Sequence, residues 1–327
     1  MKKALKRLLK KALWSASPQI ARNWFGPYKQ EFSIGIYVGE SPLFLSPVAG
    51  AVNPVLTYES ITDVPAGSVS DPFMCKFRGI WCMFFEVYNR LTGKGEIALA
   101  TSSNALDWKY ECIVLSEPYH ISYPYVFEWL GEHYMVPESS RGSGVSLYRA
   151  AEFPFCWESV GPLFKGARYA DTSVFLFRDL WWAITDGGES PLSPCLRLFF
   201  ADKLEGPWSE HPKSPVTDDI HISRPGGRIV IMNDMPIRFA QDVTPINGRH
   251  LSAFWITALT CVHYEEIPAR SGPVLEAGSE LWNCDGMHHM DAHQLSDGTW
   301  IACVDGFRMH VHYTRKYLLA SRLTPRI

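Results

Sequence analysis

The sequence lacks the features that mark several common classes of protein. No apolar run is long enough to cross a bilayer, and Lys10 and Lys11 interrupt the stretch that a secretory signal would need. The eight cysteines form no CxxC pair, and several lie in strand-like apolar runs, so we expect free thiols and a reducing compartment. The formal net charge of -3 gives no general polyanion-binding signature, and we expect no nucleic-acid partner.

The first thirty residues contain no acid. Leu5, Leu8, Leu9 and Leu13 recur at helical spacing, which predicts a short amphipathic helix. The six cations of its other face are Lys2, Lys3, Lys6, Arg7, Lys10 and Lys11. This pattern favours binding of residues 1–14 to an anionic membrane surface, at the inner face of the membrane in the cytoplasm. The alternatives are a solubilising helix that docks on the domain and a basic tail.

The rest of the chain contains a repeat of about fifty residues. Four segments read as an apolar run, a turn and an aromatic-rich run: 70–86, 122–138, 170–186 and 290–306. A second hairpin follows each of the first three, so that Ala100, Ala150 and Ala201 are about fifty residues apart. A fourth unit begins near residue 224. The sequence therefore predicts an all-β, five-bladed β-propeller of four-stranded antiparallel blades over residues 31–327, after a helix and linker in 1–30.

Acidic residues recur at the open ends of these predicted hairpins. With two-residue turns at Arg78-Gly79, Leu130-Gly131, Arg178-Asp179 and Asp297-Gly298, partners across the strands have constant index sums. Asp71 would then face Glu86, Tyr123 would face Glu138, Asp171 would face Asp186, and residue 290 would face Asp305. Because directly opposed acids repel, a recurring pair indicates a polar ligand or a cation in the central channel. The alternative is solvated acids at the rim.

Short motifs also occur in the order of a known family: Ser70-Asp71-Pro72-Phe73, FFE at 84–86, SYPYVFE at 122–128, PES at 137–139, LYRA at 147–150, GPW at 206–208, RPGG at 224–227 and QD at 241–242. Over residues 33 to 270 the chain resembles the N-terminal domain of plant glucosamine inositolphosphorylceramide transferases and its free-standing bacterial relatives. More distantly, it resembles the five-bladed propellers of glycoside hydrolase families 43 and 32. The resemblance implies a carbohydrate site, but the recognised transferase module of the plant proteins lies beyond this domain.

The hydrolase resemblance also implies roles for single residues. Asp71 matches the base or nucleophile of blade one, and Asp171 stands where blade three has its acid catalyst. Tyr123 replaces the usual acid of blade two, and Glu138 across from it could supply a displaced carboxylate. We take Asp71, Glu138 and Asp171 as the catalytic candidates.

Further residues are candidates for substrate binding. Arg141 and Arg224 could bind the phosphates of a sugar nucleotide, although Arg224 could equally neutralise the acids by a salt bridge. The stretch NCDGMHHMDAH has no established zinc spacing, so we expect His288 or His289 to line the channel and predict no metal ligands. The full set of predicted binding residues is Glu86, Tyr123, Arg141, Asp186, Arg224, Asp242, His288, His289 and Asp291.

These observations together predict a carbohydrate-active enzyme. The preferred function is a glycosyltransferase of cell-surface polysaccharide or glycolipid assembly, which would use a nucleotide sugar as donor and a carbohydrate or glycolipid acceptor. The alternatives are a glycoside hydrolase or phosphorylase of the five-bladed type and a non-catalytic glycan-binding module. No cofactor is certain, and the sequence leaves the need for a divalent metal open.

Overall fold

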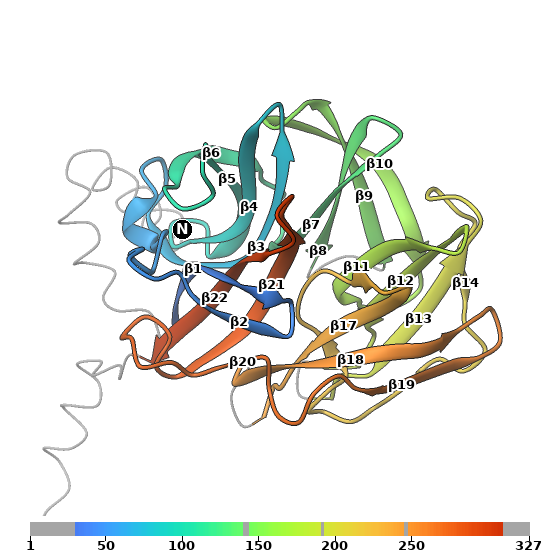
Figure 1. The fold of residues 1–327 in the computed structure, drawn as a ribbon. Coiled ribbons are helices and arrows are strands. Elements are labelled where there is room, and N and C mark those ends of the chain that lie inside the picture. The colour runs from blue at the N-terminus through green and yellow to red at the C-terminus, as the bar shows by residue number, and fades with distance from the viewer. Residues whose placement is uncertain (1–29, 140–143, 191–192, 245–247, 310–327) are drawn as a thin grey trace, which may run out of the picture.

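The computed structural model describes residues 30–139, 144–190, 193–244 and 248–309, and these residues form a five-bladed β-propeller (Figure 1). The predicted helix over residues 1–14 lies outside them. No helix within those ranges is both long and apolar enough to cross a membrane. A single 3₁₀ turn, η1 (Tyr58–Ser60), begins with a Thr57 cap whose side chain accepts a hydrogen bond from the Glu59 N–H.

Each of the first three blades is a four-stranded antiparallel sheet, which confirms the predicted repeat. Blade one contains β3 (Ala66–Phe77), β4 (Ile80–Asn89), β5 (Lys94–Ser102) and β6 (Lys109–Leu115). Blade two contains β7 (Ile121–Trp129), β8 (Glu132–Ser139), β9 (Gly144–Glu152) and β10 (Cys156–Lys165). Blade three contains β11 (Ala170–Phe177), β12 (Leu180–Asp186), β13 (Leu196–Ala201) and β14 (Ser209–Glu210).

The fourth blade is more irregular, because short strands build its inner and outer edges. It contains β15 (Arg224–Pro225), β16 (Val230–Met232), β17 (Met235–Gln241), β18 (His250–Leu259), β19 (Tyr264–Pro268) and β20 (Leu275–Glu276). Both β15 and β16 pair with β17, on its inner side, while β19 and β20 pair with β18.

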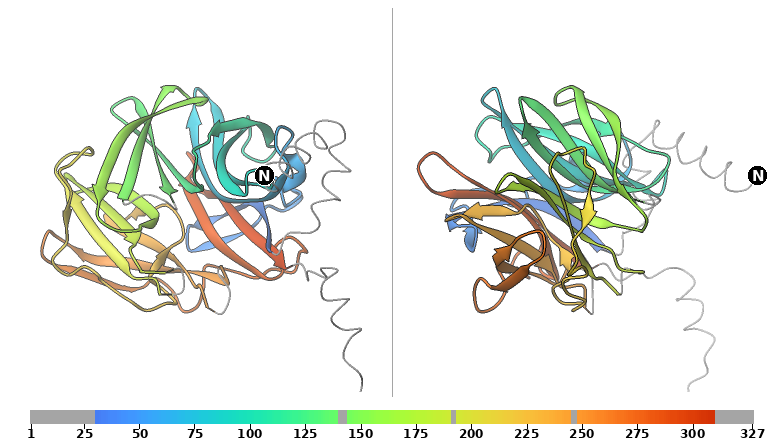
Figure 2. Two further views of the ribbon diagram at one scale, coloured as in Figure 1. Left: turned by 180° about the vertical axis from the view of Figure 1, so that it is seen from behind. Right: turned by 90° about the vertical axis from the view of Figure 1, so that its right-hand side faces the viewer.

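The fifth blade joins the two ends of the propeller. Its strands, in order, are β21 (Gly286–Gln294), β22 (Trp300–Met309), β1 (Gln30–Ser41) and β2 (Phe44–Pro47). In Figure 1 the blue β1 and β2 lie beside the red β21 and β22, and the view from behind in Figure 2 agrees. The sequence predicted a closing strand from the residues before about 60, and two of the four strands of this blade come from there.

Apolar side chains fill the space between neighbouring blades. The described residues form five buried clusters, and each joins neighbouring blades. Between blades five and one, Ile36, Val69 and Phe85 pack together, and all three are at most 1% exposed. Full burial of such side chains contributes about 1.5–3 kcal/mol each, which explains why both faces of a blade's central strands are apolar.

The predicted cross-strand pairs at the open ends are wrong by one residue. In blade one the register passes from Ser70↔Glu86 to Phe73↔Phe84, so one extra residue is inserted in β3. The same bulge occurs between Ser122 and Tyr125, and between Ala170 and Ser173. As a result, the partner of Glu86 is Ser70 rather than Asp71. In the same way, the partner of Glu138 is Ser122 rather than Tyr123, and that of Asp186 is Ala170 rather than Asp171.

The bulged residues share an unusual backbone conformation. Asp71, Tyr123 and Asp171 have φ of 53°, 46° and 51°, a left-handed region that non-glycine residues rarely adopt. Such bulges redirect a side chain and often lie beside functional sites. In blade five the difference from the predicted register has another cause. Gln294 pairs with Trp300, so the connecting loop has an odd number of residues instead of the predicted two-residue turn. His289 rather than Met290 therefore pairs with Asp305.

Candidate active site

A cavity of about 240 Å³ lies where the first residues of the inner strands meet, and all five blades contribute to it. Four predicted site residues from four blades, Asp71, Glu138, Asp171 and Arg224, line this one space, although up to 153 positions separate them in the chain. The complete lining consists of Gln30, Phe32, Ser68, Ser70, Asp71, Glu86, Tyr88, His120, Ser122, Glu138, Asp171, Arg224 and His288.

Arg224 connects the acids of blades two and three. Its Nε donates to Asp171 Oδ2 at 2.6 Å, and one Nη atom lies 3.7 Å from Glu138 Oε2. Gln241 Nε2 donates to the same Asp171 oxygen at 2.9 Å. Arg224 thus forms the salt bridge that was one of its two predicted roles. Its side chain is 13% exposed, so the pair is shielded from most solvent.

The pKa values of the two carboxyl groups beside Arg224 are shifted in opposite directions. Burial works to raise the pKa of Asp171, but Arg224 and a hydrogen bond with Glu138 outweigh it and leave that pKa below its ordinary value. Burial, followed by repulsion from Asp171, holds the pKa of Glu138 well above its ordinary value despite Arg224. The shift of Asp171 therefore favours its ionised form, and the shift of Glu138 favours its protonated form.

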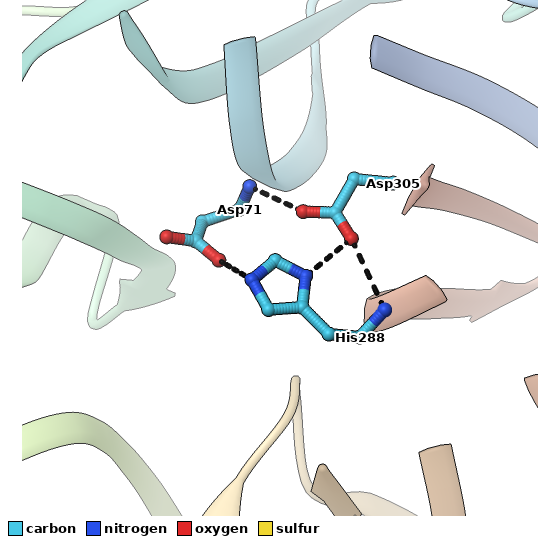
Figure 3. Close-up of side chains that lie close together, drawn as sticks. All are labelled: Asp71, His288 and Asp305. Carbon is cyan, nitrogen blue, oxygen red and sulfur yellow. Dashed lines mark hydrogen bonds and ion pairs between the residues drawn. The ribbon is translucent and has the colours of Figure 1, made fainter. Parts of the chain in front are cut away.

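A second network joins blades one and five, as Figure 3 shows. His288 Nδ1 lies 2.6 Å from Asp305 Oδ1, and His288 Nε2 lies 3.6 Å from Asp71 Oδ1. The other Asp305 oxygen accepts the Asp71 backbone N–H at 2.9 Å. Asp305 therefore orients both the histidine and the bulged backbone that carries Asp71, which is the kind of support that a strained residue needs.

The charges of this second network are also set by burial. Burial alone would lower the pKa of His288, but Asp305 outweighs it and raises that pKa to about 9. Burial likewise works to raise the pKa of Asp305, yet His288 leaves it below its ordinary value. Burial raises the pKa of Asp71 well above its ordinary value, and His288 offsets only part of this effect.

The same trio brings three possible ligand atoms within 4.8 Å of one another, close enough in principle to hold a metal ion. Asp305, however, uses both carboxylate oxygens to accept hydrogen bonds, from His288 and from the backbone N–H groups of Asp71 and His289. Its oxygens are therefore committed to orienting other groups. The geometry is that of a hydrogen-bonded triad rather than of a chelate.

Glu86 lies on the wall between blades one and two. Ser70 Oγ donates to it at 3.1 Å, and His120 Nε2 lies 3.6 Å from its other oxygen. Burial raises the pKa of Glu86 to about 7, although the bond from Ser70 acts in the opposite direction. A carboxyl group with this pKa can exchange protons near neutral pH.

Several predicted binding residues lie in the channel but not on the cavity wall. Tyr123 Oη bonds Ser173 and the backbone of Gly227, and its ring is fully buried. His289 Nε2 bonds the Pro72 carbonyl oxygen, and burial lowers the pKa of His289 to about 4. The two rings pack edge to face, with centroids 5.2 Å apart.

The remaining predicted residues have partners elsewhere. Asp291 pairs with Arg228 and His293. Asp186 accepts the backbone N–H groups of Gly188 and Cys195, and Asp242 lies 3.1 Å from His221. None of these three acids lines the cavity. Arg141 lies outside the described residues.

The sequence analysis missed the aromatic part of the wall. Phe32 lies on β1, and its ring is 4.7 Å from that of His288 between centroids. Nothing near Phe32 in the sequence indicates this position, because only closure of the propeller brings β1 to the site. Tyr88 is two residues after Glu86 and so faces the same side of β4, a signal that strand alternation contained.

Most of the chain resembles known proteins in sequence. The family described as "Glucosamine inositolphosphorylceramide transferase 1, N-terminal" matches residues 28–307. Glucosamine inositolphosphorylceramide transferase 1 from Oryza sativa subsp. japonica is 33% identical over 302 residues, and that from Arabidopsis thaliana is 31% identical over 301. The alignments cover 85% of this chain but 40% and 39% of those proteins, so the chain spans about two fifths of the length of these curated relatives.

Solved structures with this fold include several glycoside hydrolases. Zg3597, a family 117 glycoside hydrolase from Zobellia galactanivorans, has a TM-score of 0.51 at 14% identity, over 79% of this chain and 92% of that one. A thermostable family-43 glycoside hydrolase has a TM-score of 0.52 at 12% identity, over 75% and 90%. A structure from the GH130 family of mannoside phosphorylases has a TM-score of 0.53 at 10% identity, over 83% of this chain and 94% of that one. At these identities the likeness concerns the fold alone.

Proposed function

The chain belongs to the family of N-terminal domains of glucosamine inositolphosphorylceramide transferase 1, and from this premise we propose that its cavity binds a sugar and takes part in glycosyl transfer. The acceptor would be a glycolipid or polysaccharide, and the donor a nucleotide sugar. The observation that carries the proposal is that four carboxyl groups line one small cavity, with the pKa of Glu138 raised and that of Asp171 lowered. Such a pairing is what acid–base chemistry at a glycosidic carbon needs.

Each side chain has a proposed part in that chemistry. Asp171, which Arg224 keeps ionised, would face the positive charge that develops on the sugar ring in the transition state. Burial raises the pKa of Asp71 and Glu138 well above their ordinary values, which favours the protonated forms that would donate to the departing oxygen or to a sugar hydroxyl. Glu86, with a pKa of about 7, would accept the proton of the incoming hydroxyl.

The carboxyl groups of the cavity suit an amino sugar. Its wall contains four of them, Asp71, Glu86, Glu138 and Asp171, beside the two cations Arg224 and His288. A carboxyl group can accept a hydrogen bond from a sugar amine, and the name of the relatives includes glucosamine.

A glycoside hydrolase or phosphorylase is the second candidate function. Both cavity cations are already paired with carboxylates, which suits a neutral glycoside better than a phosphate leaving group. In that case Asp71 or Glu138 would protonate the leaving oxygen, and Asp171 would act as base or nucleophile. A glycan-binding module without activity is the third.

One experiment separates these functions. The full chain is incubated with a panel of nucleotide sugars, and nucleotide release and thermal protection are followed, in parallel with hydrolysis of aryl glycosides. Nucleotide release without aryl glycoside cleavage supports transfer, and the reverse supports hydrolysis. Asp71→Asn that loses turnover but keeps sugar binding excludes a purely binding module.

The proposed place of action is the cytoplasmic face of a membrane. The basic pattern of residues 1–14 supports this location, as do the free thiols of all eight cysteines. Co-sedimentation with vesicles that contain phosphatidylserine tests it: the full chain should pellet with them, and a chain without residues 1–14 should stay in solution.

A further inference from the structure

Two cavities lie on the far side of β1 from the candidate active site. Their volumes are about 280 and 440 Å³, and both are lined by Asn53, Glu280 and Trp282, so we treat them together as the Trp282 groove. Glu31 and Ser33 line the groove, whereas Gln30 and Phe32 line the active-site cavity. Successive strand residues point to opposite faces, so one strand forms a wall of both spaces.

The groove combines apolar walls with an acidic rim. Trp282 is 6% exposed and lines both cavities, while Leu281 and Val52 are 66% and 83% exposed at the edges. Three carboxylates line it, Glu31, Glu59 and Glu280, against the single guanidinium of Arg308. Arg308 pairs with Glu31 at 2.6 Å, so the groove retains an excess of negative charge. A segment with leucines on one face and cations on the other has the matching chemistry.

We propose that residues 1–14 of this chain bind in the Trp282 groove. In this complex Leu5 and Leu9 pack against Leu281 and Trp282, while the lysines lie near Glu59 and Glu280. The described chain begins at Gln30, next to the groove-lining Glu31. The connecting residues 15–29 can span about 50 Å when extended, which is ample, and so short a linker gives an effective concentration on the order of millimolar.

This binding competes with a membrane for the same segment. The leucines cannot contact the groove and a bilayer at once, so release from the groove is the step that exposes them. The inference rests on the pattern of residues 1–14 and on the groove; it does not depend on the reaction at the active site.

Crosslinking in the full chain tests the proposal. A photo-crosslinking benzoylphenylalanine at position 9 should attach to residues 51–59 or 278–283, as read by mass spectrometry of the peptides. Glu59→Lys with Glu280→Lys should reduce this yield roughly tenfold, because two attractive charge contacts become repulsive, and should increase pelleting with phosphatidylserine vesicles. The matched control is Glu132→Lys with Glu205→Lys, which makes the same charge change at exposed acids of blades two and three.

The outcomes separate the possible occupants. Crosslinks to the groove that fall in the groove variant and persist in the control support the proposal. Leu281→Asp, at an exposed position, should weaken them as well. Crosslinks that join two chains would assign the groove to a second copy, and crosslinks on other faces, or an unchanged yield in the groove variant, would likewise overturn the proposal.

Discussion

Loss of the Arg224 side chain should have a large and pH-dependent effect on stability. Arg224→Met leaves Asp171 and Glu138 without their cation, and both side chains are less than a tenth exposed. Unit charges about 4 Å apart interact by about 4 kcal/mol at an effective dielectric constant of 20. Removing one partner of a buried pair typically costs about 3–5 kcal/mol. We therefore expect the free energy of unfolding to fall by this amount at pH 8.

The sign of the pH dependence follows from the pKa of Asp171. In the wild type it is lowered on folding, so the ion pair stabilises the fold above the unfolded value of about 4, and this contribution is lost as the pH falls through the folded-state pKa. Without Arg224, burial raises the pKa of Asp171 instead. The deficit of the variant should then grow as the pH rises from about 4 to 8.

Urea unfolding at several pH values measures both effects. The control is the double variant Arg224→Met with Asp171→Asn, in which the buried charge is removed; it should be more stable at pH 8 than Arg224→Met alone. A deficit below about 1 kcal/mol at pH 8, or one of equal size at pH 5, would mean that solvent screens the pair as it screens surface pairs, and the account of the site would be wrong.

The other predictions concern single groups of the two networks. Asp71→Asn should reduce turnover by about 10²–10⁴-fold and leave sugar affinity within a few-fold in a thermal-shift titration; an equal loss of both would limit Asp71 to binding. His288 is stabilising below its unfolded pKa of about 6.5, and this effect is lost as the pH rises through about 9. His288→Asn should therefore be about 3 kcal/mol less stable than wild type at pH 6 and match it by pH 10; a constant difference in urea unfolding would contradict the assignment. Tyr123→Phe should cost about 1–3 kcal/mol in the same assay, with turnover unchanged. If folded Tyr123→Phe lost more than tenfold in turnover, the tyrosine would belong to the reaction.

The architecture could be predicted because its signals are local. A turn dipeptide between two apolar runs specifies a hairpin wherever it occurs, and about fifty residues separate the units, which leaves room for four strands each. The same repetition predicted that Asp71, Asp171 and Arg224 would share one space, since equivalent positions of successive blades lie around a common axis. These statements need only the chain's own periodicity.

The details of the site depend on contacts that no local pattern contains. At the bulge that places Asp71, the backbone N–H is held by Asp305, which is 234 positions away. The pKa of a buried acid depends on its surroundings in space: Arg224 outweighs burial and lowers the pKa of Asp171, whereas burial and the neighbouring Asp171 raise the pKa of Glu138. The sequence alone determined which elements form and roughly where their ends meet, since short-range geometry governs both. Only the tertiary structure decided register, closure and charge, because burial and long-range pairing set all three.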